Sequence, residues 1–134
     1  MNTATTITPA LWARGIIAAI VALILNLIIF FIGTSAGASM EMTSPQPMTI
    51  GVPAVIGASL APLIIAGIVT GLLANKWSKA RIVLTWVGLA LAVVSCAATF
   101  AAPDLATGLS LAGMHIVTGI AWVLAMTLGI RKNA

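Results

Sequence analysis

Four long apolar stretches alternate with short polar segments along this chain of 134 residues. The apolar stretches cover residues 12–33, 52–73, 81–101 and 105–130. About 20 helical residues, each rising ~1.5 Å, cross a hydrocarbon core of ~30 Å. The pattern therefore predicts an all-α membrane protein, in which residues 1–134 form a single domain built as a bundle of four transmembrane helices.

Composition supports lipid as the solvent of this bundle. Hydrophobic residues make up 61% of the chain and charged residues 6%, whereas soluble domains carry roughly 25% charged residues. A soluble domain of this length could not cover so much apolar surface. The net charge of +4 is therefore interpreted as a determinant of membrane topology, and no nucleic-acid partner is expected.

The charges divide cleanly between the two ends of a four-span arrangement. One end collects all six cations, namely Arg14, Lys76, Lys79, Arg81, Arg131 and Lys132. The other end holds both acids, Glu41 in the loop over residues 34–51 and Asp104 before the last span. Because cytoplasmic segments are enriched in Lys and Arg, this pattern predicts cytoplasmic termini and an outer loop at residues 34–51. Three tryptophans near the basic end, Trp12, Trp77 and Trp122, resemble an interfacial aromatic belt.

Small residues recur along the spans with a mean spacing near 3.5, as in the series Gly15, Ala19, Ala22, Asn26 of the first span. This period keeps one side of a helix against a partner in a left-handed bundle, and small side chains allow close approach. The helix-contact positions expected from these stripes are Gly67, Gly71, Gly88 and Gly119. Gly67 and Gly71 also fit the small-x-x-x-small pattern of helix dimers, so they could instead contact a second chain.

Four polar side chains are expected at similar depth in the outer half of the membrane. Counted from the charged ends, Asn26 and Ser95 each lie about 21 Å in, while Ser59 and His115 lie about 10 and 16 Å from the opposite boundary. They are therefore predicted to form one intramembrane polar layer. A structural role is open, with a neutral His115 bonded to Asn26 or a serine. A ligand-binding or proton-carrying role is also open, because imidazole titrates near physiological pH.

The loop and the basic turn offer two further candidates. Met40, Met42 and Met48 could present thioethers to Cu(I), although methionines in such a loop also serve as hydrophobic tethers. They are weak candidates, so no metal and no cofactor are predicted. Lys76, Lys79 and Arg81 are expected to set topology and to contact lipid headgroups.

The chain resembles small four-span membrane proteins of unknown function that are common in actinobacteria. The resemblance depends on Trp12-Ala13-Arg14 at the start of the first span, on Asn26, and on residues 114–119, Met-His-Ile-Val-Thr-Gly. It implies a bacterial plasma membrane and a four-helix arrangement. It supplies no catalytic or binding residues, since that family has no assigned activity.

A non-enzymatic function is predicted from these features. The two acids lie in loops, and no cluster of His and Cys accompanies them. The first interpretation is a protein that acts through helix packing, as a homo-oligomer or an accessory subunit of a larger membrane complex. The alternative is binding or transport of a small solute, ion or lipid through the layer around Asn26 and His115.

Overall fold

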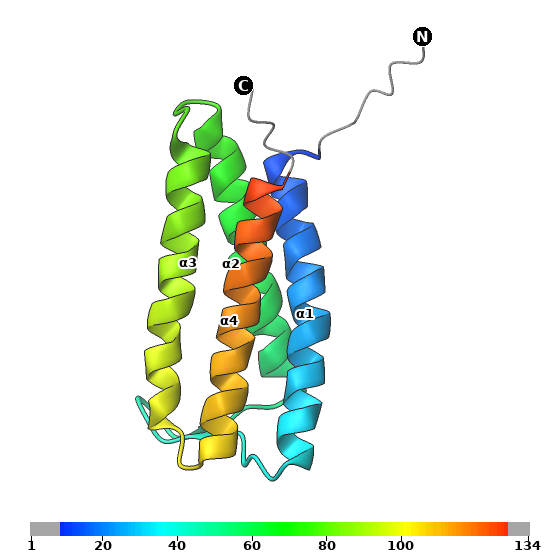
Figure 1. Cartoon of the computed structure of the whole chain (residues 1–134), viewed down its shortest axis with the longest axis vertical. Helices are drawn as coiled ribbons and strands as arrows, with labels where there is room; N and C mark the ends of the chain where they lie inside the picture. The colour runs from blue at the N-terminus through cyan, green and yellow to red at the C-terminus, as the bar shows by residue number, and fades with distance from the viewer. Residues whose placement is uncertain (1–8, 129–134) are drawn as a thin grey trace.

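The computed structural model describes residues 9–128 and contains four long helices (Figure 1). They are α1 (Leu11–Ser35), α2 (Val52–Ala74), α3 (Ala80–Ala98) and α4 (Leu105–Thr127). Each is long and apolar enough to cross a membrane, which confirms the prediction of a membrane protein with four such helices. A short 3-10 helix, η1 (Thr99–Ala101), extends α3, and residues 129–130 of the expected last span lie outside the described part.

The four helices run alternately up and down but do not pack evenly (Figure 1). Helix α1 packs extensively against both α2 and α4, and α3 packs mainly against α4. Helix α2 touches α3 and α4 only sparsely. One side of the bundle is therefore closed, and the side between α2 and α3 is loosely packed.

The closest approach of two helices joins α1 to α2 at a pair of glycines. A Cβ added to Gly67 would lie 2.8 Å from the Cα of Gly15, and one added to Gly15 would lie 2.7 Å from the Cα of Gly67. These distances would force backbone against backbone, so only glycine permits this crossing. Ala18, Ala19 and Ala22 of α1 are buried in a cluster with Leu63 of α2 and with Trp122 and Met126 of α4.

The loop between α1 and α2 contains a short antiparallel hairpin of β1 (Glu41–Met42) and β2 (Met48–Thr49), which the sequence pattern did not predict. Strands of two residues are too short to show an alternation of polar and apolar positions. Met40 precedes the hairpin with a positive φ of 54°, a conformation that is uncommon for side chains with a Cβ. It is held there because its side chain is buried and its N–H donates to Thr107 Oγ1 at 2.9 Å.

Asp104 caps the N-terminus of α4 and ties the loop to it. Its Oδ1 accepts from the backbone N–H of Thr107 at 2.7 Å, and its Oδ2 accepts from the hydroxyls of Ser39 at 2.6 Å and Thr107 at 2.8 Å. The Ser39 bond and then the Thr107 bonds favour the carboxylate and lower the pKa of Asp104 to about 2.

Two arginines from other helices bind the C-terminal carbonyl groups of α4. Arg14 of α1 donates to Ala125 O at 2.9 Å and to Leu128 O, and Arg81 of α3 donates to Met126 O at 2.6 Å. The last four carbonyls of a helix lack partners within it, and the helix dipole also stabilises cations at this end. These contacts therefore fix the end of α4 against both neighbours.

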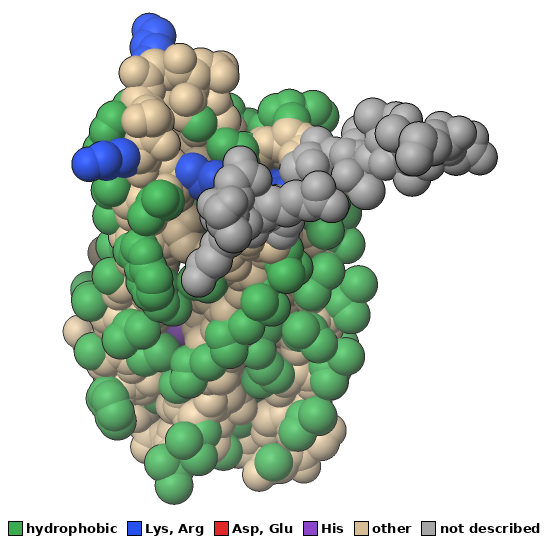
Figure 2. Space-filling model, turned by 45° about the horizontal axis from the view of Figure 1, so that its top comes forward, with side chains coloured by type: hydrophobic (Ala, Val, Ile, Leu, Met, Phe, Trp, Pro, Cys, Tyr) green, Lys and Arg blue, Asp and Glu red, His purple; other side chains and the backbone are tan. Residues whose placement is uncertain are grey.

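Among the described residues, the positive and the negative side chains lie at opposite ends of the bundle. Arg14 at the start of α1 and the basic segment between α2 and α3 share one end, whereas Glu41 and Asp104 share the other. Figure 2 shows Lys and Arg side chains near one end and hydrophobic side chains over the flanks. Arg131 and Lys132 lie outside the described residues.

Candidate functional site

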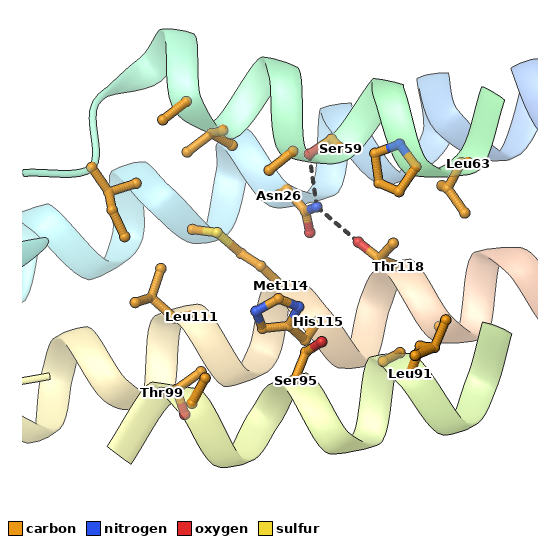
Figure 3. A pocket seen from close by; sticks show the side chains of 18 of the residues that line it. Asn26, Ser59, Leu63, Leu91, Ser95, Thr99, Leu111, Met114, His115 and Thr118 are labelled. Atoms are coloured by element: carbon orange, nitrogen blue, oxygen red, sulfur yellow. Dashed lines mark hydrogen bonds between the residues drawn. The ribbon is translucent and has the colours of Figure 1, made fainter. Parts of the chain in front are cut away.

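A cavity of about 460 Å³ lies on the loosely packed side of the bundle, between α2, α3 and α4. Its walls are mostly apolar, and Asn26 reaches it from α1 (Figure 3). The helical lining residues are Ala54, Val55, Ala58, Ser59, Pro62, Leu63 and Ala66 of α2, Gly88, Leu91, Ala92, Ser95 and Ala98 of α3, and Leu111, Met114, His115, Thr118, Gly119 and Trp122 of α4. Met42, Met48, Ile50 and Thr99 line it at the end that faces the loop.

The cavity opens sideways between α2 and α3. On α2 the lining residues Ala58 and Pro62 are exposed, and on α3 the lining residues Leu91 and Ala98 are exposed. Leu91 leaves 63% of its surface uncovered. In a bilayer this opening faces acyl chains, so a molecule dissolved in the membrane could enter without crossing an aqueous phase.

Asn26 lines the cavity from α1 and is buried, with 3% of its surface exposed. Its Nδ2 donates to Ser59 Oγ of α2 at 2.9 Å and to Thr118 Oγ1 of α4 at 3.1 Å. The amide thereby connects three helices. Its Oδ1 is buried and has no hydrogen-bond partner among the described residues, and Figure 3 shows this oxygen directed away from Ser59, toward the space beside Met114 and His115.

The structure brings all four residues of the expected polar layer to this one cavity. Asn26 and Ser59 are bonded to each other, while Ser95 and His115 line the opposite wall and are partly exposed (Figure 3). The hydrogen bond considered above between His115 and Asn26 does not form. Asn26 Nδ2 instead donates to Ser59 and Thr118. Whether this layer acts in function stays a prediction.

The three loop methionines do not form a common surface. Met40 is buried in a cluster with Phe30, Val55 and Met114, whereas Met42 and Met48 line the cavity. Within residues 9–128 no group of three or more His, Cys, Asp or Glu could hold a metal ion. Met40 thus packs in the core, and Met42 and Met48 contribute apolar surface to the cavity.

The four glycines expected at helix contacts all lie against helices of this same chain. Gly67 crosses Gly15, and Gly71 lies beside Trp12 at ordinary contact distance. A Cβ on Gly119 would lie 2.8 Å from Ala92 Cβ, and one on Gly88 would lie within 2.3 Å of Trp122 Nε1. The side of α2 that carries Gly67 is consequently covered by α1 and is not free for a second chain.

The candidate lipid-headgroup residues separate into two kinds. Lys76 and Lys79 are exposed at the turn between α2 and α3, as a headgroup contact requires. Arg81 is only partly exposed and uses its Nε on the Met126 carbonyl. Contact of Lys76, Lys79 and Arg81 with lipid headgroups stays a prediction.

Sequence reasoning missed Thr118 and misplaced Trp122. Thr118 follows His115 by three residues, so it could have been found on the same helix face. Trp122 is 2% exposed and donates from Nε1 to Leu84 O at 3.1 Å. It is not part of an interfacial belt, because Gly88 leaves room for its indole inside the bundle.

Together the fold and the cavity define a multi-pass membrane protein with four helices and a lateral cavity in its core. A model of a family of unknown function, DUF6069, matches residues 6–132, and the chain belongs to this family. No curated protein and no solved structure matches the chain.

Proposed function

We propose that this protein binds a small lipid-soluble molecule in the cavity between α2, α3 and α4. One observation carries the proposal: a cavity of about 460 Å³ is lined by Asn26, whose Oδ1 is buried and has no hydrogen-bond partner among the described residues. Ligand pockets in proteins are mostly apolar, with a few placed polar groups that orient the ligand. An unpaired polar atom in a packed core is costly, so it is retained where a ligand or water completes it.

The proposed role is binding, with no chemical step. The carboxylate of Asp104 is engaged by Ser39 and Thr107 at the end of the bundle and does not line the cavity. His115 is the titratable side chain that would lie beside the ligand. A single imidazole beside serine hydroxyls and alkyl walls favours recognition over catalysis.

An accessory or oligomeric role has weaker support. The glycine face of α2 around Gly67 and Gly71, which would suit a second helix, is used by α1. An exposed strip of α2 remains, with Gly57 and Ala61. If the protein in detergent has a mass above that of one chain, Ala61→Phe should reduce this mass if the strip is the interface. An unchanged mass would place the interface elsewhere.

We further propose that the basic end faces the cytoplasm of a bacterial plasma membrane. The support is the separation of Lys76 and Lys79 from Glu41 and Asp104 along the bundle. Two variants, Lys79→Cys and Glu41→Cys, are made separately in a Cys96→Ala background. Their cysteines should react with a membrane-impermeant maleimide from opposite sides of the membrane. Labelling of both from the same side would contradict the topology.

Photolabelling tests the binding function. A medium-chain fatty alcohol with a diazirine in its chain should label wild-type residues of the cavity, such as Ser95 and His115. Ala58→Phe places a ring in the opening and should remove most of this labelling. Ala61→Phe is the matched control, because Ala61 is exposed on α2 but does not line the cavity. Equal labelling of the two variants would refute the proposed site.

A further inference from the structure

The cavity is elongated along the helices. On α2 its lining extends from Ala54 to Ala66, and on α4 it extends from Leu111 to Trp122. At a rise of ~1.5 Å per residue, these limits lie about 18 Å apart on α2 and about 17 Å apart on α4. The hydrocarbon core of a bilayer is ~30 Å thick, so one leaflet contributes about 15 Å. The cavity is therefore long enough to hold an alkyl chain that spans one leaflet.

The opening of this cavity is confined to the half of the bundle that carries the loop. The exposed lining residues are Met48 of the loop, Ala58 and Pro62 of α2, and Leu91 and Ala98 of α3. The deepest of them on α2 is Pro62, ten residues after the start of the helix at Val52. The four helical residues therefore lie within about 15 Å of the loop-side ends of α2 and α3. A molecule can enter sideways from the leaflet on the loop side.

The other end of the cavity, which is nearer the basic residues, is closed. Leu63 and Trp122 are 4% and 2% exposed, and Gly119 is also buried. In Figure 3, Leu63 lies toward the opposite side of the view from Thr99 and Leu111. None of the charged residues that the structure describes lines the cavity. A charged headgroup at this blind end would lose its hydration without gaining a partner, which is strongly unfavourable.

We infer that the ligand is a single-chain amphiphile that enters from the leaflet on the loop side and binds with its alkyl chain directed toward Trp122. Its headgroup then stays at the loop end, where it remains hydrated. This inference depends on the proposed binding function and adds the orientation of the ligand and the leaflet that supplies it. A chain from the opposite leaflet finds no comparable opening, because the lining residues on that side are buried or only partly exposed.

Two positional probes test this orientation. Both are long-chain lysophosphatidylcholines, whose charged headgroup holds one end of the molecule at the membrane surface. One carries a diazirine at the end of its chain, and the other carries it next to the ester. In phosphatidylcholine vesicles, the chain-end probe should label Leu63 and Trp122, and the ester-side probe should label Met42 and Met48, which line the cavity near the loop. Mass spectrometry of the digested protein locates the adducts.

Leu63 and Trp122 are suitable reporters because they are buried, so lipid around the bundle does not reach them. Ala58→Phe should remove most of their labelling by the chain-end probe. Ala61→Phe, at an exposed position outside the cavity, should leave this labelling unchanged. The comparison of the two probes on the wild-type protein requires no variant.

The outcomes separate the orientation from the binding function. Labelling of Leu63 and Trp122 by the ester-side probe instead of the chain-end probe would overturn the orientation. If neither lysolipid labels these two residues while the fatty alcohol still labels the cavity, the inference is wrong and the binding function stands. Absence of cavity labelling by all three probes would overturn both.

Discussion

The contact between α1 and α2 and the gap between α2 and α3 involve the same helix but opposite packing. At Gly67 the α2 backbone approaches α1 so closely that a Cβ would lie 2.8 Å from Gly15 Cα. On the side facing α3, Ala58 and Pro62 remain exposed, as does Leu91 across the gap. Small residues on both walls of the gap, such as Ala58 and Ala92, therefore do not close a helix pair by themselves, whereas the close approach of α1 and α2 occurs where glycine faces glycine.

Asn26 contributes to this difference. Its amide lies between α2 and α4 and bonds to Ser59 and Thr118, while α2 and α4 make few direct contacts. A polar group from α1 thus links α2 and α4, which otherwise make few contacts. The cavity is the space that remains between α2, α3 and α4 beside this group.

The largest effect on stability is expected from a substitution at the close contact between α1 and α2. Gly67→Val should destabilise the bundle by about 3 kcal/mol, because its side chain meets backbone that cannot move aside. Gly57→Val is the matched control, since a Cβ at Gly57 meets nothing within 4 Å. The measurement is reversible unfolding in mixed micelles with increasing SDS. Similar unfolding midpoints for the two variants would contradict the glycine crossing.

A smaller effect is expected where α1 holds the end of α4. Arg14→Met keeps an apolar stem but removes the donors to Ala125 O and Leu128 O. The loss should be about 2 kcal/mol, which lies within the range of roughly 1.5–3 kcal/mol for a hydrogen bond to a charged group. Lys76→Met, at an exposed position of the same end, is the control. Unfolding of both variants at the wild-type midpoint would show that the arginine contacts add no stability.

The smallest effect concerns the loop that borders the open side. The lowered pKa of Asp104, about 2, means that its carboxylate stabilises the fold above its unfolded pKa of roughly 4. This stabilisation should decrease as the pH falls from about 5 to 2. Asp104→Asn still caps α4 but cannot titrate there, so its thermal unfolding should depend less on pH over this range. Parallel pH profiles for the two proteins would contradict the role of Asp104.

Much of the fold could be predicted because length and hydrophobicity alone determine helices in lipid. The convergence of Asn26, Ser59, Ser95 and His115 followed from depth, which a regular helical rise makes countable. Which stripes pair could not be predicted. Several helices carry small residues at a similar period, so nothing in one sequence indicates that Gly67 meets Gly15 while Gly57 stays free. The cavity itself depends on this pairing and so was beyond sequence reasoning.

The position of Trp122 gives the protein an intrinsic optical probe. Trp12, Trp77 and Trp86 are 54%, 45% and 61% exposed, whereas Trp122 is 2% exposed and lines the cavity. With the three exposed indoles replaced by Phe, the remaining emission comes from the inner wall alone. Quenching by a brominated amphiphile would then report the occupancy of the bundle interior in real time, separately from contact with the surrounding bilayer.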